Sequence, residues 1–196
     1  MPPKARISKT DIVTASLTLV REKGAGALNA RALAKELNCS TQPIFHNYAT
    51  MEDLWADVLT AANSLYQQHI QTAMKNTSGP PYKASGRAYI DFARQERELF
   101  KLLFMRDRTG EDISSKEEEI GPLIDLIAKN NGFSREKAYL FHLEMWIYVH
   151  GIATMIATAY LEWDEAIIEQ MLTDAYEGMR IRYQRKDKKN ECDLHP

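Results

Sequence analysis

The fold of this chain is decided by the stretch from Asn29 to Leu54, which reads NARALAKELNCSTQPIFHNYATMEDL. Asn29, Ser40 and Thr50 each precede a helical pattern, where a side-chain oxygen can accept hydrogen bonds from the free amides of the first turn. Each such cap contributes about 1 kcal/mol of stability. Ser8 starts an earlier helix in the same way, as the first residue of an S-x-x-D capping box. The sequence therefore predicts three closely spaced helices and a fourth that begins after Thr50.

Apolar spacing indicates how these helices pack. In the second helix, Leu33, Ala34 and Leu37 share one face, and the small Ala34 permits the close crossing of a helix-turn-helix. The residues expected to hold the third helix on the core are Ile44, Phe45 and Tyr48, and those left outside are Thr41, Gln42, Pro43, His46 and Asn47.

The exposed tip of the third helix has chemistry suited to DNA. Pro43 falls in the first turn counted from Ser40, where its missing N–H costs no intrahelical hydrogen bond. The Gln42 amide can bond to adenine N6 and N7 in a major groove, and Pro43 or the Thr41 methyl can contact a thymine methyl. The alternative is that these are ordinary exposed residues on a surface helix.

Residues 7–54 resemble the DNA-binding domain of the TetR family of bacterial transcriptional regulators, and 41–48, TQPIFHNY, is similar to the family's recognition helix and the turn after it. The resemblance implies base contacts from Thr41, Gln42 and Pro43, with phosphate contacts from the aromatic and histidine positions that follow. The full set of residues expected at DNA is Arg31, Ser40, Thr41, Gln42, Pro43, Phe45, His46, Asn47 and Thr50. Amides at the helix start capped by Thr50 can also hold a phosphate.

Two positions depart from the family pattern. Phe45 stands where a tyrosine is usual and Met51 where a lysine usually opens the fourth helix, so a hydroxyl and a charge that would contact phosphates are lost. We therefore expect weaker nonspecific DNA affinity and a shallower salt dependence. The same departures keep an alternative function open, a helical sensor or adaptor protein with weakened or lost DNA binding.

Composition bounds these predictions. The chain has 196 residues and a formal net charge of −2, so it is not basic throughout. Lys4, Arg6 and Lys9 nevertheless form a basic arm before the first helix, which can follow phosphates or enter a minor groove; a disordered, solvated terminus is the alternative. The two cysteines lack metal-ligand spacing, and no signal-peptide pattern opens the chain, so we expect a cytoplasmic protein without metal or cofactor.

From about residue 54 to 183 the pattern is helical throughout, which predicts an all-α protein. We expect the fourth helix over 51–76, a break at 77–81, helices over 84–94 and 98–104, and a charged loop over 106–119, with Gly121-Pro122 at the entry to the next helix. The predicted domains are a helix-turn-helix, three-helix DNA-binding domain at 1–50, a helical ligand-binding and dimerisation domain at 51–184, and a polar tail at 185–196.

The segment from Arg135 to Tyr160 is apolar on nearly every helical face. Its length permits a membrane span, but His142, Glu144 and His150 within it argue against one. We instead expect this helix to pack on its own domain and on a second copy, forming with the last helix of each chain a four-helix dimer interface. Such a homodimer can read a palindrome. The residues expected in the interface are Tyr148, Gly151, Ile152, Met155, Ile168, Leu172, Ala175 and Met179.

Residues 92–105, together with 146–151, also resemble a TetR-family C-terminal domain type named for its Trp, His and Gly. This resemblance implies a small-molecule effector that releases the protein from DNA, with coupling through movement of the fourth helix. The candidate pocket residues are Tyr66, His69, Phe100, Phe104, Trp146 and His150. The alternative is that these aromatic residues at helical spacing are plain core.

Motifs for catalysis do not accompany these helices, since the chain lacks G-x-S-x-G, a Walker loop, H-E-x-x-H and Cys-x-x-Cys. We therefore expect no catalytic residues and no enzymatic activity. The favoured function is a dimeric DNA-binding transcriptional regulator, a repressor that a small molecule releases from a palindromic double-stranded operator. Activation instead of repression also fits the sequence.

Overall fold

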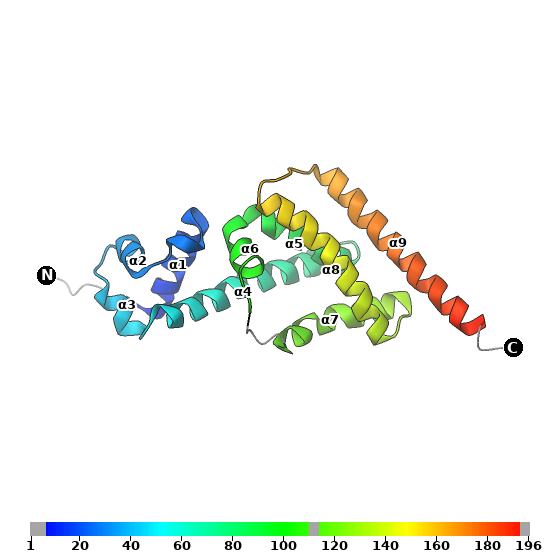
Figure 1. Cartoon of the computed structure of the whole chain (residues 1–196), viewed down its shortest axis with the longest axis horizontal. Coiled ribbons are helices and arrows are strands. Elements are labelled where there is room, and N and C mark those ends of the chain that lie inside the picture. The colour runs from blue at the N-terminus through cyan, green and yellow to red at the C-terminus, as the bar shows by residue number, and fades with distance from the viewer. Residues whose placement is uncertain (1–6, 110–113, 193–196) are drawn as a thin grey trace. The chain divides into compact units, whose positions relative to one another are not determined.

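The computed structural model describes residues 7–109 and 114–192, with the side chains of all of these except 114–119 and 186–192 (Figure 1). The regular elements within these ranges are all helical, which confirms the prediction of an all-α protein. In chain order they are α1 (Lys9–Lys23), the 3-10 helix η1 (Ala25–Ala27), α2 (Ala30–Glu36), α3 (Gln42–Asn47), α4 (Met51–Asn76), α5 (Pro81–Gln95), α6 (Arg97–Phe104), α7 (Ser114–Asn131), α8 (Arg135–Ala157) and α9 (Glu165–Cys192).

Side-chain caps set the ends of the first helices as predicted. Ser8 Oγ accepts from the Asp11 amide at 3.1 Å, and the Asp11 carboxylate accepts from the Ser8 amide at 2.8 Å. The hydrogen bonds from the side chain and backbone of Ser8 lower the pKa of Asp11. α1 ends at Gly24, whose φ of 79° lies in the left-handed region that favours glycine. Asn29 Oδ1 accepts from the Ala32 amide at 3.0 Å and caps α2.

The start of α3 differs from the prediction. The sequence predicts a cap at Ser40, but the residue before α3 is Thr41, and its side chain makes no capping hydrogen bond. Thr41 already has helical backbone angles, and its carbonyl oxygen accepts from the amides of Ile44 and Phe45 at 3.1 and 3.2 Å. The Ser40 cap is therefore wrong. Pro43 brings no amide hydrogen to this first turn, so the turn has one donor fewer for a side-chain cap to satisfy.

α4 begins at a reciprocal cap and runs its full predicted length, from Met51 to Asn76. Thr50 Oγ1 accepts from the Asp53 amide at 3.1 Å, and the Asp53 carboxylate accepts from the Thr50 amide at 3.0 Å. These two hydrogen bonds form a capping box and confirm the predicted helix start. After the predicted break, α5 begins at Pro81, three residues before the expected Ala84. Proline is favoured in a first helical turn, which explains the earlier start.

The prediction for the region before α7 is wrong. α7 begins at Ser114, inside the stretch predicted as a charged loop, and Pro122 lies within the helix instead of at its start. Residues 116–119, KEEE, have high helix propensity, which favours helix on the N-terminal side of the proline. Pro122 removes one amide from the backbone hydrogen bonds, and the helix continues through it to Asn131.

Two compact units make up the chain. The first comprises residues 1–69 and 92–107, and the second comprises 70–91 and 108–196. The first unit therefore holds α1, α2, α3, α6 and most of α4, whereas the second holds α7, α8, α9 and most of α5. α9 continues to Cys192, through residues that the sequence assigned to a polar tail. The predicted functional boundaries after residues 50 and 184 stay predictions.

The first unit packs its helices around a shared apolar core. Its fully buried side chains include Ile12, Leu19, Leu33, Ile44, Leu54, Leu99 and Phe100. α1 and α6 lie against each other. There the Arg21 guanidinium donates two hydrogen bonds to the Glu96 carboxylate, at 2.8 and 2.9 Å. This bidentate pair ties the end of α1 to the start of α6.

The second unit has its core between α7, α8 and α9. The buried members of this core are Ile124, Ile127, Phe133, Ala138, Phe141, Met145 and Tyr183. His142 on α8 is also buried, and its Nδ1 lies 3.1 Å from the Tyr82 hydroxyl of α5. Burial lowers the pKa of His142 to about 4. The imidazole is therefore neutral near pH 7, and the Tyr82 hydroxyl beside it is uncharged and belongs to a partly buried residue.

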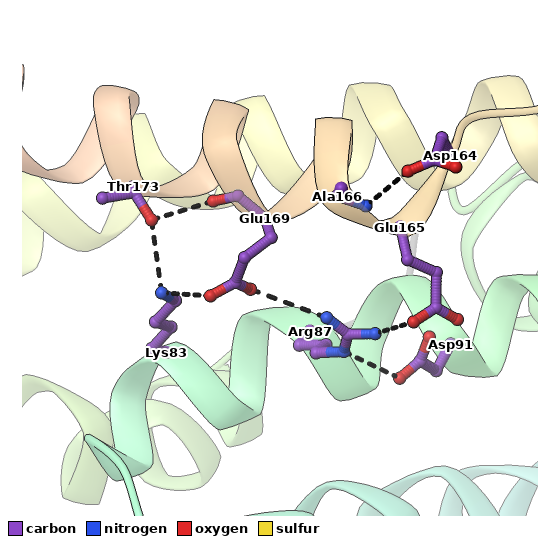
Figure 2. A network of polar contacts seen from close by, with 8 residues as sticks. All are labelled: Lys83, Arg87, Asp91, Asp164, Glu165, Ala166, Glu169 and Thr173. Carbon is purple, nitrogen blue, oxygen red and sulfur yellow. Dashed lines mark hydrogen bonds and ion pairs between the residues drawn. The ribbon is translucent and has the colours of Figure 1, made fainter.

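An ionic network joins α5 to the start of α9 (Figure 2). Arg87 pairs with Glu165 and, at 3.8 Å, with Asp91, while Lys83 pairs with Glu169. The hydrogen bond from Lys83 lowers the pKa of Glu169, and burial opposes that shift. These partly exposed pairs fasten the first turns of α9 to α5 within the second unit.

α8 has two apolar faces, as predicted. Within residues 7–109 and 114–192 it is the one helix long and apolar enough to cross a membrane, and 44% of its apolar window is buried in the protein. Phe141, Met145 and Ile152 face the core. Leu140 and Ile147 remain 48% and 65% exposed on the other side. One face of α8 thus belongs to the core, and the other is an exposed apolar surface.

Candidate nucleic-acid interface

α3 is held by two buried residues and exposes most of the others. Ile44 and Tyr48 are buried, Gln42 is exposed, and Pro43 lies partly exposed in the first turn. Phe45 is 48% exposed, so the prediction that it packs in the core is wrong. Side chains four positions apart lie on one face of a helix, and Ile44 and Tyr48 occupy the inner face here, whereas Phe45 follows Ile44 about 100° further around the helix. The tip is therefore presented outward on a fixed base.

Tyr48 joins the end of α3 to two other helices. Its hydroxyl donates to Asp57 Oδ2 of α4 at 2.8 Å, and Lys9 Nζ of α1 lies 4.6 Å from its ring centroid. Burial, with the hydrogen bond and charge of Asp57, raises the pKa of Tyr48 to about 12. The hydroxyl thus stays a donor at any ordinary pH. The sequence analysis predicted Tyr48 as a core residue and missed its bond to Asp57. Its hydroxyl was a signal for such a bond, because a buried hydroxyl needs a hydrogen-bond partner.

The nine residues predicted at DNA lie on α2, on the turn and helix that follow it, and at the start of α4, all within the first unit. The exposed ones are Arg31, Ser40, Gln42, Phe45, His46 and Thr50, and the partly exposed ones are Thr41, Pro43 and Asn47. Asn47 differs from the others because its amide faces inward, where Nδ2 donates to the carbonyl oxygens of Pro43 and Ile7. Lys9 and Lys35 add exposed positive charge. Lys4 and Arg6 of the predicted basic arm lie outside the described residues.

The start of α4 offers less to a phosphate than a free helix end. The amides of Thr50 and Asp53 are used by the capping box, which leaves those of Met51 and Glu52. Glu52 and Asp53 also place two carboxylates in the first turn. A phosphate here would meet these negative charges without the lysine that the family pattern has at position 51.

Four of the six candidate pocket residues meet in the first unit. The Tyr66 ring lies 5.0 Å from that of Phe104 and 5.4 Å from that of Phe92, both edge-on. Phe100 lies 5.0 Å from Phe104, and His69 lies 5.7 Å from Phe92. Phe92 and Phe100 are fully buried, which agrees with the alternative that these aromatic residues form hydrophobic core and do not line a ligand pocket. Sequence reasoning missed Phe92 as a member of this cluster, although it lies inside the stretch that carries the second resemblance.

The other two candidates, Trp146 and His150, lie in the second unit. Their rings stack at 4.9 Å between centroids with an interplanar angle of 18°. His150 Nδ1 lies 2.8 Å from the Tyr89 hydroxyl. Partial burial lowers the pKa of His150. Tyr89, which the sequence did not single out, therefore fixes the ring against which Trp146 stacks.

The predicted dimer residues separate into two groups. Ile152, Ile168 and Leu172 are buried inside the second unit, out of reach of a second copy. The partly or largely exposed ones are Tyr148, Gly151, Met155, Ala175 and Met179. Helical spacing predicts which faces are apolar, but it does not predict which of them packs against other helices of the same chain. The predicted set therefore contains both buried and exposed residues. Among the described residues no group of His, Cys, Asp and Glu side chains is arranged to hold a metal ion.

Comparison with known proteins agrees with this fold. A family model described as the tetracyclin repressor-like C-terminal domain matches residues 82–177. The chain is similar in structure to a protein of Pseudomonas aeruginosa PAO1 assigned as a transcriptional regulator, with TM-score 0.71 and 15% identity over 94% of this chain and 98% of that one. Curated proteins show no significant sequence match.

Two further solved structures carry the family name. One is a protein of Vibrio parahaemolyticus assigned to the TetR family of transcriptional regulators, with TM-score 0.61, 16% identity, and coverage of 87% of this chain and 97% of that one. The other is a TetR family member from Streptomyces coelicolor A3, with TM-score 0.60, 19% identity, and coverage of 86% and 98%. The C-terminal type named for Trp, His and Gly stays a prediction. Residues 82–177 thus match a tetracyclin repressor-like C-terminal domain, and the chain shares the all-α fold of these three solved structures.

Proposed function

We propose that the protein is a cytoplasmic, dimeric repressor that a small molecule releases from a palindromic DNA operator. The observation that carries DNA binding is the tip of α3. There Gln42 is exposed and Pro43 stiffens the first turn, above the buried Ile44 and Tyr48. A fixed, exposed carboxamide can donate to and accept from the edge of adenine in a major groove.

Dimerisation is supported by apolar side chains that the single chain leaves uncovered. Ile147 of α8 and Ile167 and Ile181 of α9 are large, exposed and apolar. Gly151 and Gly178, on the same two helices, have open space where a Cβ would stand, which would let a second copy approach closely. An apolar surface of this kind is typical of an interface. A two-fold dimer would also supply the second recognition helix that a palindrome needs.

Response to an effector is supported by the contacts of α6. This helix carries Phe100 and Phe104, which contact each other in the group of rings that also includes Tyr66 and Phe92. Arg21 of α1 donates two hydrogen bonds to Glu96, the residue before α6. A ligand that separated the rings would displace α6 and, through this pair, α1. Movement of α4, which carries Tyr66 and begins beside α3, would then change the distance between the two recognition helices of the dimer.

The testing experiment is fluorescence anisotropy with duplexes from the DNA flanking the gene, over a salt series. We expect selective binding to a palindrome, and Gln42→Ala should weaken it about 5- to 100-fold while relaxing the preference at one base pair. Gln71→Ala is the matched control, since Gln71 is an exposed glutamine in the second unit, on α4. If no flanking duplex binds even at low salt, the proposal fails.

The sensor or adaptor function is favoured by a specific observation, the exposed Phe45 and the acidic, lysine-free start of α4. Restoring the family residues separates the two functions. In a DNA-binding protein, Phe45→Tyr with Met51→Lys should raise affinity, and the charge of the added lysine should steepen the salt dependence by about 0.9 in log–log slope. A chain that remains unable to bind after both changes would be the adaptor.

A further inference from the structure

We propose that Tyr48 is a positioning residue for DNA binding, which fixes the tilt of the recognition helix α3 against α4 through the bond from its hydroxyl to Asp57. This inference rests on the proposed DNA binding, and it assigns no DNA contact to Tyr48 itself. The bond reaches across the connection between the two helices, so it determines the direction in which the tip of α3 points.

The connection between α3 and α4 is short. α3 ends at Asn47, Tyr48 has extended backbone angles, and α4 begins at Met51. The Tyr48 hydroxyl donates to Asp57 Oδ2 at 2.8 Å, nine positions further along the chain. The bond therefore passes over the connection and ends about two turns into α4.

Two carboxylates on one face of α4 accept hydrogen bonds from this connection. Asp53 and Asp57 are four positions apart, so they lie on the same side of the helix. Asp53 accepts from the Thr50 amide at 3.0 Å, and Asp57 accepts from the Tyr48 hydroxyl. The first bond fixes the corner between the helices. The second bond fixes the tilt, since one attachment alone would leave α3 free to pivot about that corner.

The Tyr48 ring is buried, which holds its hydroxyl in place. The residue is 3% exposed, and Lys9 Nζ of α1 lies 4.6 Å from the ring centroid. A phosphate at the hydroxyl would lie beside the negative charges of Asp53 and Asp57, which repel it. Tyr48 therefore acts on DNA binding through the position of α3, and not through a contact of its own.

A small tilt of α3 at Tyr48 would displace the tip that is proposed to read bases. The six residues of α3 extend about 9 Å along the helix axis. A tilt of about 10° would then shift Gln42 by about 1.5 Å, whereas a binding group has to be held within about 0.5 Å of its working position. Loss of the bond should therefore weaken base readout more than it weakens contacts to phosphates, which carry no sequence information.

The first test compares specific with nonspecific DNA binding in Tyr48→Phe, which keeps the ring beside Lys9 and loses the hydroxyl. Affinity for the palindrome should fall about tenfold, as for the loss of one bidentate base contact. Affinity for a duplex of random sequence should fall less than about twofold. An unchanged affinity for the palindrome overturns the proposal. An equal loss on both duplexes also overturns it, because the hydroxyl would then act on the phosphate backbone.

Substitution of Asp57 tests the partner of the bond, and the sign of its effect separates charge from position. Loss of a negative charge by itself strengthens DNA binding or leaves it unchanged. Asp57→Ala should instead weaken binding to the palindrome about tenfold, and in that background Tyr48→Phe should cost less than about twofold more. Asp57→Asn keeps an oxygen acceptor and should retain most of the affinity. Tighter binding by Asp57→Ala, or additive costs, overturns the proposal.

Glu52 provides a matched control, since it is an exposed carboxylate in the first turn of the same helix. Glu52→Ala removes one negative charge from α4 and leaves the acceptor of the Tyr48 hydroxyl in place. It should leave the affinity for the palindrome unchanged or raise it. A tenfold loss in this variant too would mean that binding responds to any lost carboxylate of α4, and it would overturn the proposal.

Hydrogen exchange without DNA separates this inference from the proposed function. In Tyr48→Phe the amides at positions 44, 45 and 48, which bond to carbonyl oxygens within the α3 segment, should exchange about tenfold faster. Those of α1 and α4 should change less than about twofold. If Tyr48→Phe fails to fold, Asp57→Ala, at an exposed position, is measured in the same way.

The outcomes of the exchange experiment are distinct. Unchanged exchange in α3, or an equal rise in α1, α3 and α4, overturns this inference whether or not the protein binds DNA. Faster exchange confined to α3, in a chain that binds no palindrome, supports the link between α3 and α4 and overturns the proposed function.

Discussion

α3 and α8 differ in length and in how much of each is buried in the core of its unit. α3 has six residues, too few for an isolated helix to persist in water, and Ile44 is its buried residue. α8 has 23 residues and buries one side in the core of the second unit. The short helix is shaped by its neighbours and can expose an amide and a proline ring. The long helix contributes many residues to the core of its unit and also has a second apolar face, which is exposed.

The largest expected effect lies on the core side of α8. Phe141 is fully buried, and its ring lies 5.3 Å from that of Tyr176 and 5.6 Å from that of Tyr183. Phe141→Ala should lower the free energy of unfolding by about 4 kcal/mol, because it leaves a cavity among these rings. Urea unfolding followed by circular dichroism measures this. A loss below about 1 kcal/mol would mean that α8 does not form the core as described.

The base of α3 should be nearly as sensitive, and here stability and DNA binding should fall together. Ile44 is fully buried, and Ile44→Ala should cost about 3 kcal/mol. Since a six-residue helix cannot persist alone, we expect the amides of α3 to exchange hydrogen faster while those of α8 stay protected. Equal loss of protection in both helices would show that the two regions unfold as one.

A pH titration tests the buried polar group of α8. Burial lowers the pKa of His142 to about 4, so the unfolded chain takes up a proton first as the pH falls. The stability owed to a neutral His142 is fully present above pH 6.5 and is lost progressively down to about pH 4, with about 2 kcal/mol gone by pH 5. His142→Gln should flatten this part of the stability profile. A profile that keeps its slope in this variant would assign the loss to other groups.

The smallest effect on the protomer's fold is expected on the outer face of α8. Ile147 is 65% exposed, so Ile147→Lys should change the protomer's stability by less than about 0.5 kcal/mol. It should nevertheless shift the sedimentation coefficient from that of a dimer to that of a monomer. Phe45→Lys, at an exposed apolar residue of α3, is the matched control and should leave the assembly unchanged. A monomeric parent protein would contradict the proposed dimer.

Local chemistry made much of the fold predictable. The caps at Ser8, Asn29 and Thr50 involve residues only three positions apart, so the sequence contains both partners of each bond. The starts of α3 and α7 were not predictable from the same signals. Pro43 removes a donor from the first turn of α3, and Pro122 lies inside α7 instead of marking its start. At the start of α3 the Thr41 carbonyl oxygen accepts backbone hydrogen bonds, and the expected side-chain cap is absent.

The candidate site was predictable as a surface but not as a set of contacts. The exposure of Gln42 and Pro43 follows from helical spacing around Ile44. The bond from Asn47 to Ile7 spans 40 positions, and that from Arg21 to Glu96 spans 75. Such pairings depend on how helices meet in space, which periodicity within one helix does not determine. For the same reason Ile152, Ile168 and Leu172 were predicted at a dimer interface and are instead buried within the chain.

The stacking of Trp146 on His150 gives the second unit an optical reporter. A protonated imidazole in contact with an indole quenches its fluorescence, and a neutral one does so much less. Because partial burial lowers the pKa of His150, the emission of Trp146 should dim only as the medium becomes more acidic than an ordinary histidine requires. A solute that parted the two rings, or pulled the Tyr89 hydroxyl from its 2.8 Å contact with His150, would change that emission without any label.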